Sequence, residues 1–259
     1  MSQPLLERIQ NRLMGLYDAP SAAEAYSKIE AMLQAYQTDS NESASSRWTQ
    51  DDVMLITYGD TFLKEGEMPL KTLQTFLKKH VKQAINNVHI LPFFPYSSDD
   101  GFSVIDYKMV NPDLGDWHDV EAIGEDYDLM FDLVVNHISR ESLWFTDYKA
   151  NNSPYNEFFV EMEGAEDVSQ VTRPRNTPLL VPAYTHRGRK LVWATFSADQ
   201  IDLNFKNHLV LVKMVEVLLL YLEKGSRTIR LDAIAFLWKE LGTNCIHLPQ
   251  THEVVKLLR

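Results

Sequence analysis

Apolar residues along this chain follow two alternating patterns, short continuous runs and longer stretches with helical spacing. The runs predict four β-strands, at residues 53–58, 88–91, 129–135 and 228–233. The spaced stretches predict helices, at residues 70–85, 117–124, 209–223 and 251–258. Strands that alternate with helices indicate parallel βα units, and their apolar character indicates a sheet covered on both faces.

Two segments depart from this alternation. Residues 1–37 are predicted to be helical, with Ser21 and Glu24 forming an S-x-x-E capping box. The polar residues 38–50 are predicted to be a linker. Residues 144–190, rich in Asn, Pro, Arg and Gly, interrupt the pattern after the third strand.

The pattern as a whole predicts an α/β fold, the N-terminal half of a (β/α)8 TIM barrel with about four βα units. The chain is predicted to begin with a helical extension and linker (residues 1–50), followed by barrel strands 1–3 (residues 51–143). An inserted subdomain B (residues 144–190) then precedes strand 4 with its flanking helices (residues 191–259). A small doubly wound sheet is the alternative, weakened because no Gly-rich phosphate loop follows the first strand.

Composition narrows the class of protein. The chain of 259 residues is 45% hydrophobic and 24% charged, as in a globular domain. A net charge of −11 argues against nucleic acid or an anionic membrane as partner, because phosphates are bound by clustered Lys and Arg.

Cellular location is predicted from cysteine content and apolar runs. The single cysteine, Cys245, excludes a disulfide within the chain and fits a reducing cytoplasm. A buried structural cysteine is preferred over a catalytic thiol. The start of the chain does not read as a signal peptide, and Lys213 and Glu216 interrupt the most apolar run, so we expect a cytoplasmic protein without a membrane span.

Polar residues at the ends of the third and fourth strands are the candidate functional groups, because barrel active sites lie at the C-terminal ends of strands. In the DLVVNH run, Asp132 and Asn136 share one face; in the IRLDA run, Arg230 and Asp232 do so. An arginine beside a carboxylate lowers its pKa, so Asp232 is expected to stay ionised, as a glycosyl nucleophile must. The spacing alone also allows a purely structural Arg–Asp pair.

These segments resemble a known family. DLVVNH at 132–137, QIDLN at 200–204 and IRLDA at 229–233 are similar, in this order, to signature segments of the α-amylase superfamily. Stretches at 91–120, 138–145, 173–175 and 230–243 resemble its sucrose-phosphorylase-like branch, which acts on sucrose, sucrose phosphate, glucosylglycerol or glucosylglycerate. The stretch LWKELGTNCIHLPQTH is nearer to the last two. The resemblance runs from about residue 53 to the end and leaves residues 1–50 unexplained.

The resemblance implies a retaining α-glucoside phosphorylase that transfers glucose from sucrose, glucosylglycerol or glucosylglycerate to inorganic phosphate. Phosphate is then a co-substrate, and no cofactor is implied. Asp232 would be the nucleophile and Arg230 would orient it. Asp99, Phe102 and His137 would bind the glucosyl group. Asp132 and Asn136 would hold the strand end, and Asp202 and Asn204 would be structural.

Several of these roles have structural alternatives. Asp99 precedes an Asp-Gly pair that is common in turns. Phe102 and His137 could be ordinary core residues. Arg173 and Arg175 flank Pro174, and stiffened loop arginines suit bidentate anion binding, here of phosphate; two solvated arginines are the alternative.

Metal binding is not expected. Some relatives coordinate calcium near the position of Asn136, but the resemblance assigns no metal to the phosphorylase branch. The small-molecule partners are therefore an α-glucoside and phosphate, and the oligomeric state is left open.

A second carboxyl group is needed as acid/base in a retaining mechanism. The resemblance places it at the end of a fifth strand, and the chain ends at Arg259; Glu240 and Glu253 lie in predicted helical stretches and do not fit. We expect the chain on its own to be inactive, with unpaired edges at its first and fourth strands. A hydrolase or transglucosidase of the same superfamily and a non-catalytic sugar-binding protein are the alternatives.

Overall fold

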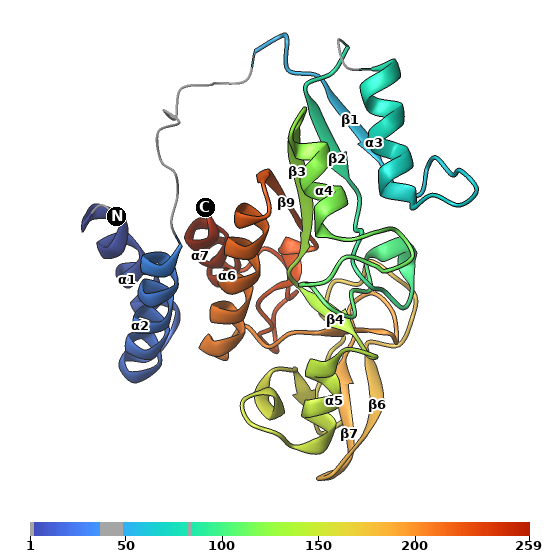
Figure 1. The fold of residues 1–259 in the computed structure, drawn as a ribbon. Helices are drawn as coiled ribbons and strands as arrows, with labels where there is room; N and C mark the ends of the chain where they lie inside the picture. Colours follow the sequence, from blue (N-terminus) through green and yellow to red (C-terminus); the bar gives the residue numbers. More distant parts are fainter. Residues whose placement is uncertain (1–2, 37–48, 82–83) are drawn as a thin grey trace.

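The computed structural model describes residues 3–36, 49–81 and 84–259, and its centre is a four-stranded parallel sheet (Figure 1). The strands lie side by side in sequence order: β1 (Met54–Thr57), β2 (Asn87–Ile90), β3 (Asp128–Val134) and β9 (Ser226–Asp232). A doubly wound sheet reverses its strand order at a switch point. This sheet does not, so it is a partial (β/α)8 barrel, as predicted.

The four predicted barrel helices are confirmed as α3 (Pro69–His80), α4 (Trp117–Gly124), α6 (His208–Glu223) and α7 (Pro249–Leu258). Helix α4 has the predicted bounds because Asp116 and Asp119 form a capping box at its start. Helix α3 ends five residues earlier than predicted, since Val81 leaves the helical region with φ −129° and ψ 0°. Apolar spacing therefore continued beyond the end of the helix.

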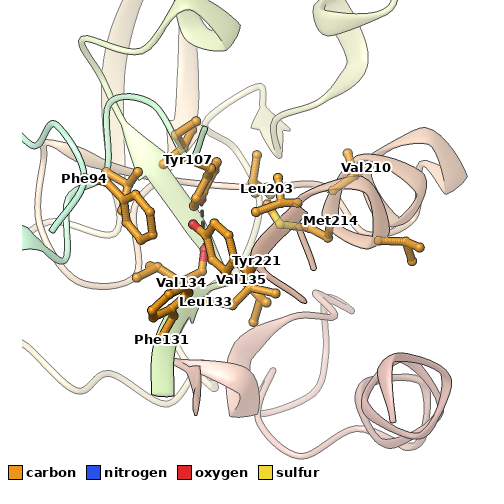
Figure 2. Packing of buried hydrophobic residues seen from close by; sticks show 14 of the residues in the cluster. Phe94, Tyr107, Phe131, Leu133, Val134, Val135, Leu203, Val210, Met214 and Tyr221 are labelled. Atoms are coloured by element: carbon orange, nitrogen blue, oxygen red, sulfur yellow. Dashed lines mark hydrogen bonds between the residues drawn. The ribbon is translucent and has the colours of Figure 1, made fainter. Parts of the chain in front are cut away.

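Aromatic side chains fill the space between the sheet and α6, as Figure 2 shows. The ring of Tyr221 on α6 stacks on Phe94 with 5.0 Å between centroids and meets Phe131 of β3 edge to face. Beside them the buried hydroxyl of Tyr107 donates to the carbonyls of Val134 (2.8 Å) and His137 (2.7 Å). The end of β3 is thus fixed from the core side.

The segment between β3 and α6 forms antiparallel structure at the carboxyl end of the sheet (Figure 1). Strand β4 (His137–Ser139) pairs with β8 (Gln200–Asp202), and a second sheet has the order β5-β7-β6. The remaining elements are α5 (Leu143–Ala150), β5 (Glu161–Met162), β6 (Leu180–Thr185), β7 (Gly188–Trp193), and the 3₁₀ turns η1 (Asp99–Gly101), η2 (Tyr155–Glu157) and η3 (Ile234–Phe236). The division at residues 144 and 190 stays a prediction.

The N-terminal extension is a hairpin of α1 (Gln3–Leu16) and α2 (Ala19–Ala35) beside α6 and α7 (Figure 1). Its predicted capping box is wrong: Asp18 is the N-cap and accepts a hydrogen bond from the Ser21 amide at 2.9 Å. Pro20 suits the first turn, so the helix begins before Ser21. The predicted linker falls mostly on residues 37–48, outside the described residues.

Two further predictions concern single residues. Cys245 is buried, as predicted, and packs with Val160, Leu179 and Trp193. Glu240 does not lie in a helix; it follows η3 in an irregular segment. Within the described ranges, no helix is both long enough and apolar enough to cross a bilayer.

Candidate active site

Arg230 is shared between two carboxylates at the end of the sheet. In the parallel register Asp132 of β3 lies beside Arg230 of β9. The guanidinium forms an ion pair with Asp132 and places Nη2 3.2 Å from Asp232 Oδ1. Asp132 is fully buried, and its other oxygen lies 2.6 Å from His89 Nε2. This network holds the Arg230 guanidinium between Asp132 and Asp232.

The electrostatic state of Asp232 differs from the sequence expectation. Burial raises the pKa of Asp232 above its ordinary value, and the opposing charge of Arg230 offsets this only in part. The expectation that Arg230 lowers this pKa was therefore wrong in net direction, because the strand end is more desolvated than a two-residue pattern can indicate. A desolvated carboxylate is a stronger base and a stronger partner for a developing positive charge.

A cleft of about 360 Å³ opens over Asp232. This volume is within the range of small-molecule sites. Its walls include six of the seven predicted site residues, namely Asp99, Phe102, His137, Arg175, Arg230 and Asp232. Tyr58, Asp100, Phe196 and Gln200 complete the lining. The tertiary structure thus brings together groups from six separate stretches of the chain.

Asp99 lies in a backbone turn of unusual conformation. Asp99, Asp100 and Gly101 have φ values of 58°, 49° and 100°, all in the left-handed region. Each such non-glycine residue costs roughly 1–3 kcal/mol. Gly101 is required here, since a Cβ would lie 2.7 Å from the carbonyl oxygen of Pro92. The Asp99 carboxylate accepts a hydrogen bond from Gln200 Nε2 at 2.9 Å, so the turn is aimed at the cleft.

Phe102 and His137 line the cleft and also pack into the protein interior. Phe102 lines the cleft and packs against the core, and the Arg230 guanidinium lies 5.6 Å from its ring centroid. His137 Nε2 lies 3.0 Å from the Phe102 carbonyl oxygen and 3.2 Å from Gln200 Nε2. The nearby Asp202 raises the pKa of His137, but burial outweighs this and lowers the pKa. The neutral imidazole is therefore favoured.

The two arginines of the RPR segment are not brought together. Arg175 is exposed and lines the cleft, whereas Arg173 turns back and donates to the carbonyl of Thr177. The arrangement does not place a bidentate pair on one anion. Arg175 alone is positioned to meet an anion that enters the cleft.

A buried ammonium group, that of Lys239, lies between Asn136 and Asp202. Lys239 Nζ lies 2.7 Å from Asp202 Oδ2 and donates to Asn136 Oδ1 at 2.8 Å. Asn136 in turn donates to Asp202 at 2.9 Å. Burial lowers the pKa of Lys239 and Asp202 opposes this. In the part of the chain that the structure describes, no cluster of three or more His, Cys, Asp or Glu side chains could hold a metal ion.

Sequence reasoning missed Gln200, Lys239 and Tyr58. Gln200 begins the QIDLN segment, whose match to the family was noted without a role for its first residue. Lys239 follows Asp232 by seven residues in an irregular segment, so no periodicity connects it with Asn136. Tyr58 directly follows β1, and the rule that sites lie at strand ends would have selected it.

Comparisons with known proteins identify the family to which the chain belongs. The family model for the α-amylase catalytic domain matches residues 79–256. Glucosylglycerate phosphorylases from Spirochaeta thermophila and Escherichia coli are 47% and 44% identical, each over 98% of this chain. The crystal structure of sucrose 6F-phosphate phosphorylase from Thermoanaerobacter thermosaccharolyticum is similar, with a TM-score of 0.73, 32% identity and 82% of this chain covered.

The chain belongs to the α-amylase family, because the catalytic-domain model of that family matches it and its sheet forms part of the barrel. Within that family the chain belongs to the sucrose-phosphorylase-like branch, that of the α-glucoside phosphorylases. The chain spans less than half the length of these relatives, 44% of the Spirochaeta protein and 46% of the crystallised one.

Proposed function

We propose that this chain forms the nucleophilic half of a retaining phosphorylase that acts on glucosylglycerate. The observation that carries the proposal is the Asp132–Arg230–Asp232 network at the base of a cleft lined by Asp99 and His137. The names of the relatives that match almost the whole chain at 43–47% identity favour glucosylglycerate over sucrose.

In the first step Asp232 attacks the anomeric carbon of the glucosyl group, and the bond from that carbon to the glycerate oxygen breaks. A covalent glucosyl-enzyme forms, and the leaving oxygen takes a proton from a general acid. Inorganic phosphate then attacks the same carbon, returns a proton to the acid/base group, releases Asp232 and gives α-glucose 1-phosphate with net retention. Arg175, at the wall of the cleft, is the group of this chain proposed to attract that phosphate.

We assign the general acid to none of the residues that the structure describes. Within the described ranges, Glu240 pairs with Lys206 at 2.7 Å and Glu253 pairs with Arg12 at 2.6 Å, and neither lines the cleft. General acid–base catalysis contributes about 10²–10⁴-fold. The 259-residue polypeptide alone is therefore expected to turn over substrate slower than a complete enzyme by at least that factor.

A chimaera tests the proposal. The chain would be fused to the part of Escherichia coli glucosylglycerate phosphorylase that it does not cover, and incubated with glucosylglycerate with and without phosphate. We expect α-glucose 1-phosphate only with phosphate, and its loss by several orders of magnitude in Asp232→Asn, while Asp167→Asn on an exposed loop stays active. Release of free glucose at an equal rate without phosphate would indicate a hydrolase. Glucose binding without turnover would indicate a sugar-binding protein.

A further inference from the structure

The loop 97–103, which carries Asp99 and Phe102, is held by one carboxylate that the proposed chemistry does not use. Asp199 Oδ2 accepts hydrogen bonds from three serine hydroxyls, those of Ser97 (2.6 Å), Ser98 (2.5 Å) and Ser103 (2.7 Å). These serines lie on both sides of the left-handed turn. The carboxylate therefore joins the two ends of the loop.

Further contacts make this a closed network. Ser139 of β4 places its hydroxyl 2.5 Å from that of Ser97, and both Ser103 and Ser139 are fully buried. Within the loop, the Ser97 amide donates to the Ser103 carbonyl (3.1 Å) and the Ser103 amide donates to the Ser98 carbonyl (3.2 Å). Ser97, Ser98 and Asp199 are half-buried, so the network runs from the protein surface to the buried hydroxyls of Ser103 and Ser139.

Asp199 remains an acceptor because it stays ionised. Its burial would raise the pKa, but the hydroxyls of Ser97, Ser98 and Ser103 outweigh burial and lower the pKa below its ordinary value. Hydrogen bonds to an ionised acceptor are roughly twice as strong as neutral ones. Three of them on one oxygen can offset the strain of the left-handed residues Asp99 and Asp100.

We propose that Asp199 is a positioning residue that keeps the loop 97–103 closed, so that Asp99 and Phe102 are already aimed at the cleft before a glucosyl group arrives. The neighbouring Gln200 completes the arrangement, because it donates to Asp99 from the cleft side. Preorganisation of this kind lowers the ordering cost of binding. The inference rests on the proposed function for its substrate, but the loop itself can be tested without substrate.

Hydrogen exchange of the 259-residue chain tests the loop directly. In Asp199→Ala the amides of Ser97, Phe102 and Ser103 should exchange roughly ten- to a hundredfold faster, as expected when hydrogen bonds to a charged group are lost. Asp199→Asn, which keeps the shape and one acceptor oxygen, should restore part of the protection. Asp167→Asn, another loop carboxylate that bonds a serine amide, is the matched control and should leave these amides unchanged.

A double-mutant cycle separates the serine contacts from general destabilisation. In a chain with Ser97, Ser98 and Ser103 all changed to Ala, the further change Asp199→Ala should add little to the exchange rate. Unchanged protection in Asp199→Ala, or fully additive effects in the cycle, would overturn the proposal.

Glucose affinity, measured by calorimetry on the same variants, connects the loop with the cleft. We expect weaker binding in Asp199→Ala and partial recovery in Asp199→Asn, in the same order as loop protection and independent of melting temperature. Equal affinity in all variants, despite a loosened loop, would contradict the positioning role. If the unmodified chain binds no glucose, the carbohydrate assignment loses its support, whereas the exchange data still decide whether Asp199 closes the loop.

Discussion

Replacement of the buried Lys239 by Met is expected to destabilise the chain strongly. The ammonium group is the only cation within 4.0 Å of Asp202 among the described residues, at 2.7 Å, and both side chains are almost fully buried. Asp202 would keep its bonds from the Thr195 amide (2.8 Å) and hydroxyl (2.6 Å), but its charge would lose its counterion. Removal of one partner of a buried ion pair costs about 3–5 kcal/mol.

Thermal unfolding followed by circular dichroism at pH 7 gives the measurement. At about 2–4 °C per kcal/mol for a domain of this size, the melting temperature of Lys239→Met should fall by roughly 6–20 °C. The double variant Lys239→Met/Asp202→Asn removes both charges and should recover most of the loss. Lys206→Met, which breaks the exposed pair with Glu240, is the control and should cost less than about 1 kcal/mol.

The reasoning would be refuted by a Lys239→Met chain as stable as the control, because the charge of Asp202 would then be compensated by other groups. A double variant less stable than either single variant would also contradict it, since the loss would then come from packing and not from an unpaired charge.

Four further variants test predictions of stability. Because the folded-state pKa of Asp232 is raised, Asp232→Asn should stabilise the fold at pH 7, and this gain should vanish as the pH falls below the ordinary value of 3.8. The folded-state pKa of Asp199 is lowered, so Asp199→Asn should destabilise the fold at pH 7. This loss of stability should also vanish in acid, as the pH falls through the folded-state pKa of Asp199. Equal melting temperatures of these variants and the unmodified chain from pH 7 to pH 3 would contradict both signs. Gly101→Ala should cost about 1–3 kcal/mol in urea unfolding because of its positive φ and the Pro92 carbonyl, and a neutral effect would exclude the described turn. Tyr17→Phe should cost about 1 kcal/mol by removing a 3.0 Å hydrogen bond to a backbone carbonyl, and an unchanged melting temperature would argue against docking of the N-terminal hairpin through this contact.

Much of the barrel was predictable because its signals are local. The strands β1, β2, β3 and β9 were each located to within two residues, since buried parallel strands are short apolar runs. The antiparallel strands around β7 were not predicted. Strand β5 has only two residues, Pro182 interrupts the apolar run of β6, and β7 carries the polar residues Arg189 and Lys190 in its first half, so none of them has the signal of a buried strand.

The candidate site was predictable only where residues lie on one strand. Arg230 and Asp232 share a face by simple alternation, and the cleft confirms their proximity. Arg173 and Arg175 follow the same spacing in a loop, where no regular geometry fixes side-chain direction, and they point to different partners.

The amino-acid sequence by itself determined the order of strands and helices, because hydrophobic spacing depends only on neighbouring residues. It also determined which polar groups stand at strand ends. Only the tertiary structure decided that Asp199 collects three serine hydroxyls, that Lys239 neutralises Asp202, and that the pKa of Asp232 is raised. Burial and charge pairing sum over groups that are distant in the chain, so these properties exist only once the strands and loops have come together.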